Sequence, residues 1–264
     1  MRILKSHVLT VVVFLLTSAA FAGEIRERFE KTCPLARNGY FSLENTNGAV
    51  RLSVWDREEV RIEAEKVASA GREEDAKKLL AATEIIVRQG QNRVEVITRT
   101  PQCSDGGFWD WVFGNGSGRV AVTYWITVPR DIDLQVETVN GDIKAQEISG
   151  RADLETTNGG VDVTDAAGSV SVETTNGRIA ISLKQVNRGE SMQFETTNGS
   201  IVSEFPQDFS ATLSASTTNG RINCDFPLTM QSAYERTSLE GRIGEGGGKL
   251  TLETTNGSIS IRRR

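Results

Sequence analysis

Carboxylates are the most regular residues in this sequence that could carry chemistry. Glutamates stand four residues before the glycine of a recurring Asn-Gly pair, at Glu137, Glu155, Glu173, Glu195 and Glu253. If these side chains stack, their charges repel one another, which raises some pKa values or recruits cations such as calcium. The aspartate-rich glycine repeat of calcium-binding β-rolls is absent. Because Arg178, Arg221 and Arg242 follow these glycines and would relieve the charge, we expect a solvated acidic face and no metal site.

A glycine-rich segment at residues 103 to 118, CSDGGFWDWVFGNGSG, holds four clustered aromatic side chains: Phe108, Trp109, Trp111 and Phe113. Clustered aromatics on a loop can stack on sugar rings or dock a partner. They can also fold over the open end or side of a repeat stack, which needs an apolar cover. The cover is favoured because an exposed quartet would promote aggregation. Binding by this loop is the functional hypothesis.

Two pairs of aspartates could supply an acid and a base, as in polysaccharide-cleaving β-helices. They are Asp131 with Asp133, and Asp162 with Asp165. Surface acids are abundant in most proteins, and nothing in the sequence singles out one pair. We therefore expect no catalytic residue and no enzyme.

The first 22 residues are typical of a secretory signal peptide. Arg2 and Lys5 precede the apolar run VLTVVVFLLTSAAF, and Ala20-Phe21-Ala22 forms a cleavage site. The apolar run is short for a transmembrane helix and is followed at once by charged residues. We expect a cleaved protein in the periplasm, outside the cell or on its surface, with no stable membrane insertion.

Cleavage would also change the chemical inventory, because the single histidine, His7, lies in the signal segment. Without histidine, Ser-His-Asp and Cys-His catalysis and imidazole zinc sites are excluded. Removing Arg2 and Lys5 takes the 30 basic residues to 28 against 35 acidic ones, a net charge of about −7. This charge argues against nucleic-acid binding. No cofactor is expected.

Three cysteines, Cys33, Cys103 and Cys224, leave one pair and one odd thiol in an oxidising compartment. We expect a bridge between Cys33 and Cys103, because the repeat places Cys224 at an inward position, where a free cysteine behaves as a small hydrophobe. The spacing fits no metal motif.

The Asn-Gly pairs recur every 16 to 22 residues from Gly141 onward, with an earlier copy at Gly48 and a degenerate copy at Glu240-Gly241. This period is the signature of a solenoid, in which each coil buries its apolar face on its neighbours. The corner asparagines are Asn140, Asn158, Asn176, Asn198, Asn219 and Asn256. A β-branched aliphatic residue two positions after each glycine forms the expected core ladder: Ile143, Val161, Ile179, Ile201, Ile222, Ile243 and Ile259.

An antiparallel meander is the alternative, because Asn-Gly between alternating strands is also a strong hairpin signal. A meander gives no reason for the flanking Thr-Thr and the aliphatic residue to recur in one register. Stacked coils place identical residues over one another at roughly 4.8 Å, where Asn and Thr can form hydrogen-bonded ladders. We therefore predict a parallel β-solenoid, with glycine at the corner because it tolerates positive φ.

Residues 23 to 130 are the less regular N-terminal part of this one domain, and residues 131 to 264 are its regular coils. The segment 40 to 55 is expected to form an initial coil, residues 71 to 82 an amphipathic cap helix, and residues 119 to 129 the strand that leads into the repeats. The final SISIRRR is expected to end the stack with charges that discourage edge pairing.

The run YWITVPRDIDLQVETVNGDI, followed by VETTNGRI and FETTNGSI, resembles the bacterial adhesin-type family of domain of unknown function DUF4097, over about residues 38 to 261. The resemblance implies a β-solenoid on an exported or envelope protein, with no established catalytic residues. We expect a binding module for an envelope glycan or protein. The alternatives are a scaffold that docks an envelope protein partner and a glycan-active enzyme; the oligomeric state stays open.

Overall fold

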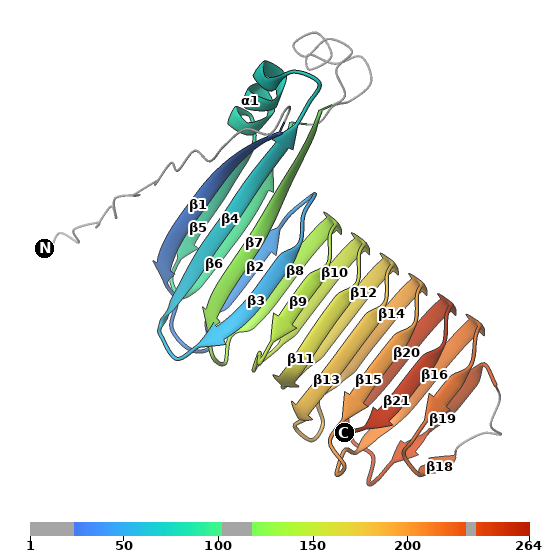
Figure 1. The fold of residues 1–264 in the computed structure, drawn as a ribbon. Helices are drawn as coiled ribbons and strands as arrows, with labels where there is room; N and C mark the ends of the chain where they lie inside the picture. The colour runs from blue at the N-terminus through green and yellow to red at the C-terminus, as the bar shows by residue number, and fades with distance from the viewer. Residues whose placement is uncertain (1–23, 102–117, 231–235) are drawn as a thin grey trace, which may run out of the picture.

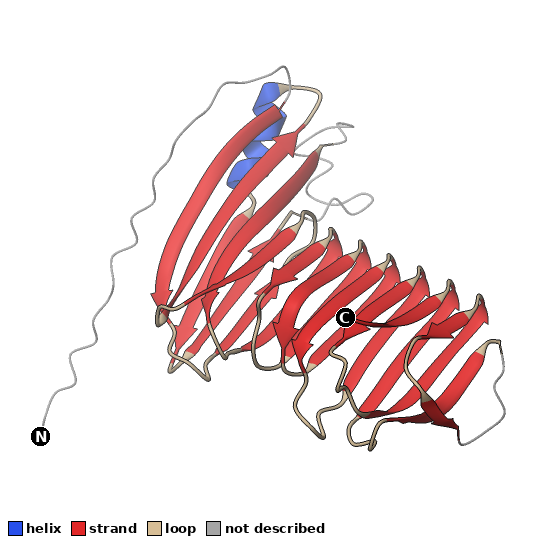
Figure 2. Ribbon diagram, turned by 60° about the horizontal axis from the view of Figure 1, so that its bottom comes forward, coloured by secondary structure: helices blue, strands red, loops and turns tan. Residues whose placement is uncertain are grey.

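The structure is a computed structural model that describes residues 24–101, 118–230 and 236–264 (Figure 1). The described chain is nearly all strand, with one short helix (Figure 2). Two sheets face each other, and most of their strands pair in parallel. The predicted all-β solenoid is therefore confirmed, and the alternative meander is wrong.

Within the described residues, sheet 1 contains ten strands and sheet 2 contains eleven. In spatial order, sheet 1 is β1 (Glu24–Pro34), β4 (Glu59–Ser69), β7 (Arg119–Pro129), β3 (Val50–Trp55), β9 (Ile143–Gln146), β11 (Val161–Ala167), β13 (Ile179–Gln185), β15 (Ile201–Phe205), β21 (Ile259–Arg263) and β17 (Ile222–Cys224). Sheet 2 is β18 (Leu228–Met230), β19 (Ser238–Ile243), β16 (Ala211–Asn219), β20 (Lys249–Asn256), β14 (Met192–Asn198), β12 (Val170–Asn176), β10 (Ala152–Asn158), β8 (Asp133–Asn140), β2 (Tyr40–Glu44), β6 (Arg93–Arg99) and β5 (Glu84–Gly90).

Each regular coil is a strand of sheet 2, an Asn-Gly corner and a strand of sheet 1. Alternate residues of both strands face the space between the sheets, as the period-two pattern of the sequence requires. The first inward residue after each corner stacks on its equivalent in the next coil, in a row made of Val50, Ile143, Val161, Ile179, Ile201, Ile259 and Ile222. All of these are buried, and each stabilises the fold by about 1.5 to 3 kcal/mol.

Ile243 does not belong to this row, contrary to expectation. Glu240 and Gly241 lie inside β19, which pairs antiparallel with β16, so they form no corner. Ile243 is buried, but in sheet 2, where its backbone partners are Ala211 and Leu228. The sequence keeps the spacing of the repeat here while the chain folds back as a hairpin.

The corner glycines are required by close packing and not, with the exception of Gly48, by positive φ. Gly48 has φ of 121°, whereas the later corner glycines have no positive φ. A Cβ atom on Gly177 would lie 1.8 Å from the carbonyl oxygen of Gly159, and one on Gly199 would lie 1.9 Å from that of Gly177. The expected reason for glycine was therefore wrong: the coils approach so closely that only glycine fits.

The order of coils along the stack differs from their order along the chain at both ends. The first coil, β2 with β3, lies between the strands β6 and β7 on one side and β8 and β9 on the other. The last coil, β20 with β21, lies between β14 and β15 on one side and β16 and β17 on the other. Both terminal coils of the sequence are therefore internal (Figure 1).

This order corrects the expectation for the C-terminal arginines, which do not end the stack. Arg264 forms an ion pair with Asp165, and Arg262 lies 3.8 Å from Glu204. The stack ends instead at β17 and at the antiparallel strands β19 and β18.

The N-terminal part extends beyond the regular coils as the long antiparallel strands β1, β4 and β7 (Figure 1). Helix α1 (Glu73–Ala81) covers the far end of these strands, close to the expected range of 71 to 82. Its apolar side, Ala76, Leu79 and Leu80, packs with Ala68 and Val120 in a small core separate from the main one.

Candidate functional site: the repeated polar face

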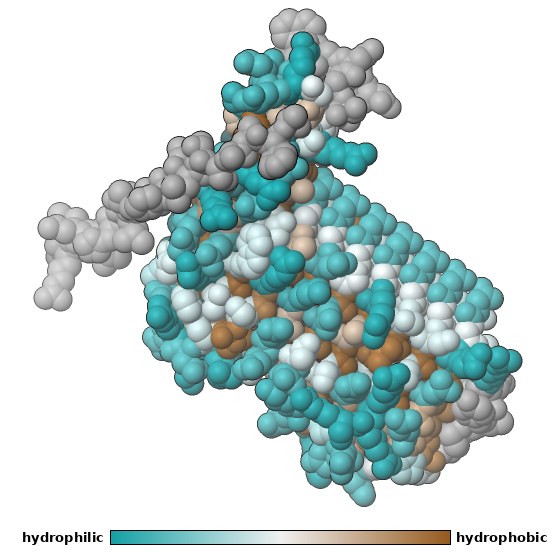
Figure 3. Space-filling view, in the orientation of Figure 1, coloured by the Kyte–Doolittle hydropathy of each residue, from teal (hydrophilic) through white to brown (hydrophobic). Residues whose placement is uncertain are grey.

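The corner edge of the solenoid carries an unbroken row of asparagine side chains. In each contact the side-chain amide nitrogen donates to the amide oxygen of the neighbouring coil, at 2.8 or 2.9 Å. The row runs through Asn47, Asn140, Asn158, Asn176, Asn198, Asn256 and Asn219. These side chains are exposed, except that of the half-buried Asn47, and the edge appears as regular rows of residues in the space-filling view (Figure 3).

Buried threonines support each corner from inside. The hydroxyls of Thr156, Thr174, Thr196, Thr254 and Thr217 each donate to the carbonyl oxygen of a corner glycine in the neighbouring coil, at 2.8 to 3.0 Å. Thr138 is buried in the same row but its hydroxyl has no partner among the described residues. The equivalent carbonyl, that of Gly48, accepts instead from the side chain of Asn45 at 3.2 Å. The corners are thus held by the asparagine contacts on the outside of the stack and by hydrogen bonds to the glycine carbonyls on the inside.

The glutamates form a straight row on the outer face of sheet 2. The strand register pairs Glu44 with Glu137, and continues through Glu155, Glu173, Glu195 and Glu253 to Ser216. An adjacent outward row consists mostly of threonines. A groove of about 260 Å³ lies over both rows, between Glu173, Glu195 and Glu253 and their threonine neighbours. The face therefore repeats a carboxylate, a hydroxyl and an amide at the spacing of parallel strands.

The charge of this row is not relieved as expected. No glutamate of the row forms an ion pair with another described residue. In particular, none pairs with Arg178, Arg221 or Arg242. Glu137 and Glu195 accept hydrogen bonds from Gln135 and Gln193, at 2.7 and 2.6 Å. Partial burial, followed by the charges of Glu137 and Glu173, raises the pKa of Glu155. The row is therefore a set of carboxylates without ion-pair partners among the described residues, two of which accept hydrogen bonds from glutamines.

No cluster of three metal-binding side chains occurs within residues 24–101, 118–230 and 236–264. The same ranges contain no helix with the length and apolar character needed to cross a membrane.

The aspartates of the two pairs lie in different local structures. Asp131 and Asp165 both have positive φ, at 61° and 57°; Asp131 lies in the bend before β8, and Asp165 lies inside β11 where its register with β13 is irregular. Hydrogen bonding from Arg264 lowers the pKa of Asp165, which Lys184 also approaches at 3.7 Å. Asp133 accepts from the backbone of Arg151, and Asp162 is exposed on β11.

The aromatic residues Phe108, Trp109, Trp111 and Phe113, and Cys103, lie outside the described residues. Cys33 is buried and carries a free thiol in the structure; its predicted bridge to Cys103 stays a prediction. Cys224 is half-buried and packs against the core from the edge strand β17. Burial raises the pKa of both described thiols, which disfavours the reactive thiolate.

Two features escaped the sequence analysis. Glu44 extends the glutamate row to the first coil, and its position four residues before Gly48 was the available signal. Trp125 is exposed on β7, between the outward Thr123 and Thr127, although its strand was predicted. The alternation of TYWIT, with Tyr124 and Ile126 buried, was sufficient to place this tryptophan outside.

Three crystal structures and one family model resemble this chain. Two crystal structures are similar over 90% of this chain: a "putative cell adhesion protein" from Clostridium sporogenes, with 12% identity, full coverage of that chain and a TM-score of 0.43, and a "putative adhesin" from Bacteroides fragilis, with 10% identity, 97% coverage and a TM-score of 0.39. A third, a "Putative lipid binding protein" from Parabacteroides distasonis, has 8% identity, coverage of 90% and 96%, and a TM-score of 0.23. Likenesses this distant carry no weight for fold or function.

No curated protein matches the chain significantly. The family model described as Toastrack DUF4097 matches residues 131–262, a narrower range than the expected 38 to 261. The matched range holds the regular coils with their asparagine, threonine and glutamate rows. The chain belongs to the Toastrack DUF4097 family.

Proposed function

We propose that this protein is an exported, non-enzymatic binding module of the cell envelope, of adhesin type, that holds its ligand on the repeated face of sheet 2. The observation that carries the proposal is the in-register row of glutamates from Glu44 to Glu253, which borders a threonine row and has no ion-pair partner among the described residues. Unpaired outward carboxylates and hydroxyls at a constant spacing are suited to a polymer with a repeating polar unit, such as an envelope glycan or protein.

Export is consistent with the position of the first strand. β1 begins at Glu24, two residues after the predicted cleavage site, so removing residues 1 to 22 leaves every described element intact. Of the aspartates considered as an acid and a base, Asp165 is engaged by Arg264, which lowers its pKa and makes it unsuited to act as a general acid.

The test is saturable binding of purified residues 23 to 264 to cell-envelope fractions and to a glycan panel. The variant Glu173→Gln, Glu195→Gln removes two charges from the middle of the row. Its matched control, Asp162→Asn, Glu204→Gln, removes two outward charges from sheet 1. We expect the first variant to bind about tenfold more weakly and the control to bind like the parent.

Absence of saturable binding by the parent protein, or equal loss in both variants, would contradict the proposal. The variant Trp109→Ala, Trp111→Ala tests the aromatic loop in the same assay. Loss of binding in that variant, with the circular dichroism spectrum retained, would move the ligand from the glutamate row to the loop.

A scaffold that docks an envelope protein is the second candidate, and one observation favours it. β1 is an eleven-residue edge strand of sheet 1 whose one partner among the described strands is β4. An extended peptide of a partner protein can add to such an edge through its backbone. Its alternating Arg and Glu side chains would oppose pairing with copies of itself and leave a charge pattern for a partner to match. Pull-down from envelope extracts, lost on introducing proline at Arg28, would support this candidate.

A further inference from the structure

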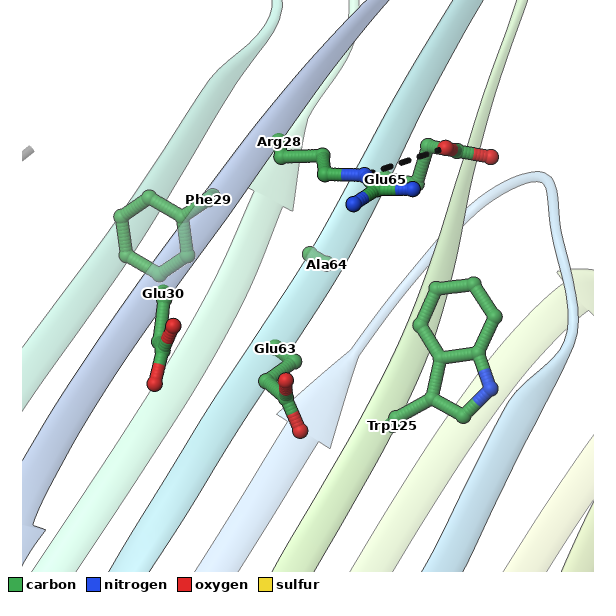
Figure 4. Close-up of a pocket in the computed structure, with 7 residues that line it drawn as sticks. All are labelled: Arg28, Phe29, Glu30, Glu63, Ala64, Glu65 and Trp125. Carbon is green, nitrogen blue, oxygen red and sulfur yellow. Dashed lines mark ion pairs between the residues drawn. The ribbon is translucent and has the colours of Figure 1, made fainter. Parts of the chain in front are cut away.

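A groove on the outer face of β1, β4 and β7 lies far from the glutamate row and is built around Trp125 (Figure 4). Arg28 and Glu30 come from β1, Glu63 and Glu65 from β4, and Trp125 from β7. We call this the Trp125 groove. Its volume is about 450 Å³, within the range of roughly 300 to 1,000 Å³ found for small-molecule sites.

The indole of Trp125 is 39% exposed, although the residues on either side of it in the chain are fully buried. A single exposed aromatic side chain is ordinary by itself. Here, however, the indole forms one wall of a groove whose other walls are charged side chains of two neighbouring strands (Figure 4). A flat apolar surface beside converging polar groups is the usual composition of a ligand site.

The charges in the Trp125 groove are balanced. Arg61 lies 3.0 Å from both Glu30 and Glu63. Glu65 is 3.2 Å from Arg26 and 3.6 Å from Arg28. Every carboxylate of the groove therefore has a guanidinium partner, in contrast to the unpaired glutamates on sheet 2.

This balance decides which class of ligand fits. A cationic ligand would have to displace guanidinium groups from the carboxylates, and the Trp125 ring already has the Arg51 guanidinium 5.5 Å from its centroid. An anionic ligand would meet three carboxylates. A neutral ring with hydroxyls on its rim avoids both costs, because the hydroxyls can donate to the carboxylates and accept from the arginines.

We propose that the Trp125 groove binds a neutral sugar ring, stacked on the indole and hydrogen-bonded to Glu30, Glu63 and Arg28. The side chains of Arg28 and Glu30 are 72% and 59% exposed, so both keep hydrogen-bonding capacity for a ligand. Glu65, at 19%, is more buried and holds Arg28 in place. The inference rests on the proposed function as a binding module and adds a second site with a defined ligand class.

The test is titration of purified residues 23 to 264 with neutral oligosaccharides of glucose and of N-acetylglucosamine, followed by saturation-transfer NMR and calorimetry. We expect Trp125→Ala to weaken binding by about tenfold or more and Trp125→Phe to retain most of it, because a phenyl ring still offers a stacking surface. Glu63→Gln should weaken binding by a smaller factor. Asp162→Asn, which removes an exposed carboxylate from β11 of the same sheet, is the control for Glu63→Gln and should bind like the parent.

Three results would overturn the inference: no binding of either oligosaccharide, equal binding by the parent and a folded Trp125→Ala variant, or binding only of charged ligands with steep dependence on salt. The envelope-binding assay separates this site from the proposed function. Envelope binding that survives Trp125→Ala but is lost with Glu173→Gln, Glu195→Gln leaves the proposed function intact and limits any failure to the Trp125 groove.

Discussion

At the scale of single residues, the fold depends on atoms that touch across neighbouring coils. The corner glycines have no room for a Cβ atom, and the threonine hydroxyls donate to the carbonyls of these same glycines. Sequence alone identifies both positions, because the Asn-Gly alignment fixes them. It does not reveal the reason for glycine, since positive φ and close approach both select this residue.

Substituting a corner glycine should strongly destabilise the protein. In Gly177→Ala the new Cβ would lie 1.8 Å from the backbone oxygen of Gly159, so two coils must separate. We expect a loss of about 3 kcal/mol or more in the free energy of unfolding. The control is Gly71→Ala, where no atom lies within 4 Å of the added Cβ and the change should be within about 1 kcal/mol. Urea denaturation of both variants measures the difference, and similar midpoints would contradict the close-approach explanation.

The buried threonines offer a second matched comparison. Thr174→Val removes the hydroxyl that donates to the carbonyl of Gly159 at 3.0 Å, leaving that carbonyl without this bond, and should cost about 1 to 3 kcal/mol. Thr138→Val removes a buried hydroxyl that has no partner among the described residues, and should leave stability nearly unchanged or raise it. Thermal unfolding of the two variants is the measurement; an equal loss in both would show that the hydrogen bond is not the stabilising contact.

At the scale of elements, the strand register aligns like charges on one face of sheet 2. Period-two alternation predicts which residues point outward, and the repeat predicts that the glutamates stack. Whether arginines neutralise the charge of the glutamate row was not predictable in the same way. The arginines follow the corner glycines, and side chains beyond the corner no longer lie in the plane of the row. Thus the positions in the glutamate row follow from the sequence, while the partners of these glutamates depend on the path of each corner.

Glu155 should therefore make stability depend on pH in a defined direction. Burial and the two adjacent glutamates raise its pKa in the folded state above the ordinary value of 4.5. The folded protein then holds the proton more tightly than the unfolded chain, so this group favours folding at low pH and this contribution is lost as pH rises through the raised pKa. We expect Glu155→Gln to raise the melting temperature at pH 7, with the gain shrinking as pH falls toward 4.5. A constant gain at both pH values would contradict this account.

At the scale of the whole molecule, the stack is assembled out of sequence order. The repeat predicts that coils stack but not which coils are neighbours, because the coils present the same corner asparagine, inward threonine and aliphatic residue, apart from Asn45 in place of the threonine in the first coil. The long interval between Gly48 and Gly141, and the loss of Asn-Gly at Glu240, are the places where the chain departs from simple succession. Contacts between distant segments, absent from any local pattern, decide the order.

Deleting the last coil of the sequence should therefore destabilise its neighbours in the stack as well. Deleting residues 249 to 264 takes β20 and β21 from between β14 and β16, and we expect β16 and β17 to lose their protection as well. In the intact protein, amides of β20 and β21 should exchange with solvent as slowly as those of β12, although they lie near the C-terminus. Hydrogen exchange of the intact and shortened proteins tests both statements. Retained protection of residues 211 to 219 in the shortened protein would mean that β16 pairs directly with β14.

The internal position of the first and last coils also limits how such a protein can grow during evolution. A copy of the coil β2–β3 or β20–β21 added next to it in the chain would meet sheet positions that are already filled, since β2 and β20 each have a neighbour on both sides. Between Gly141 and Gly199, by contrast, succession in the gene and succession in space coincide, and an extra copy extends both sheets by one strand without changing any other pairing. Relatives of different length should therefore gain or lose their coils in this central stretch.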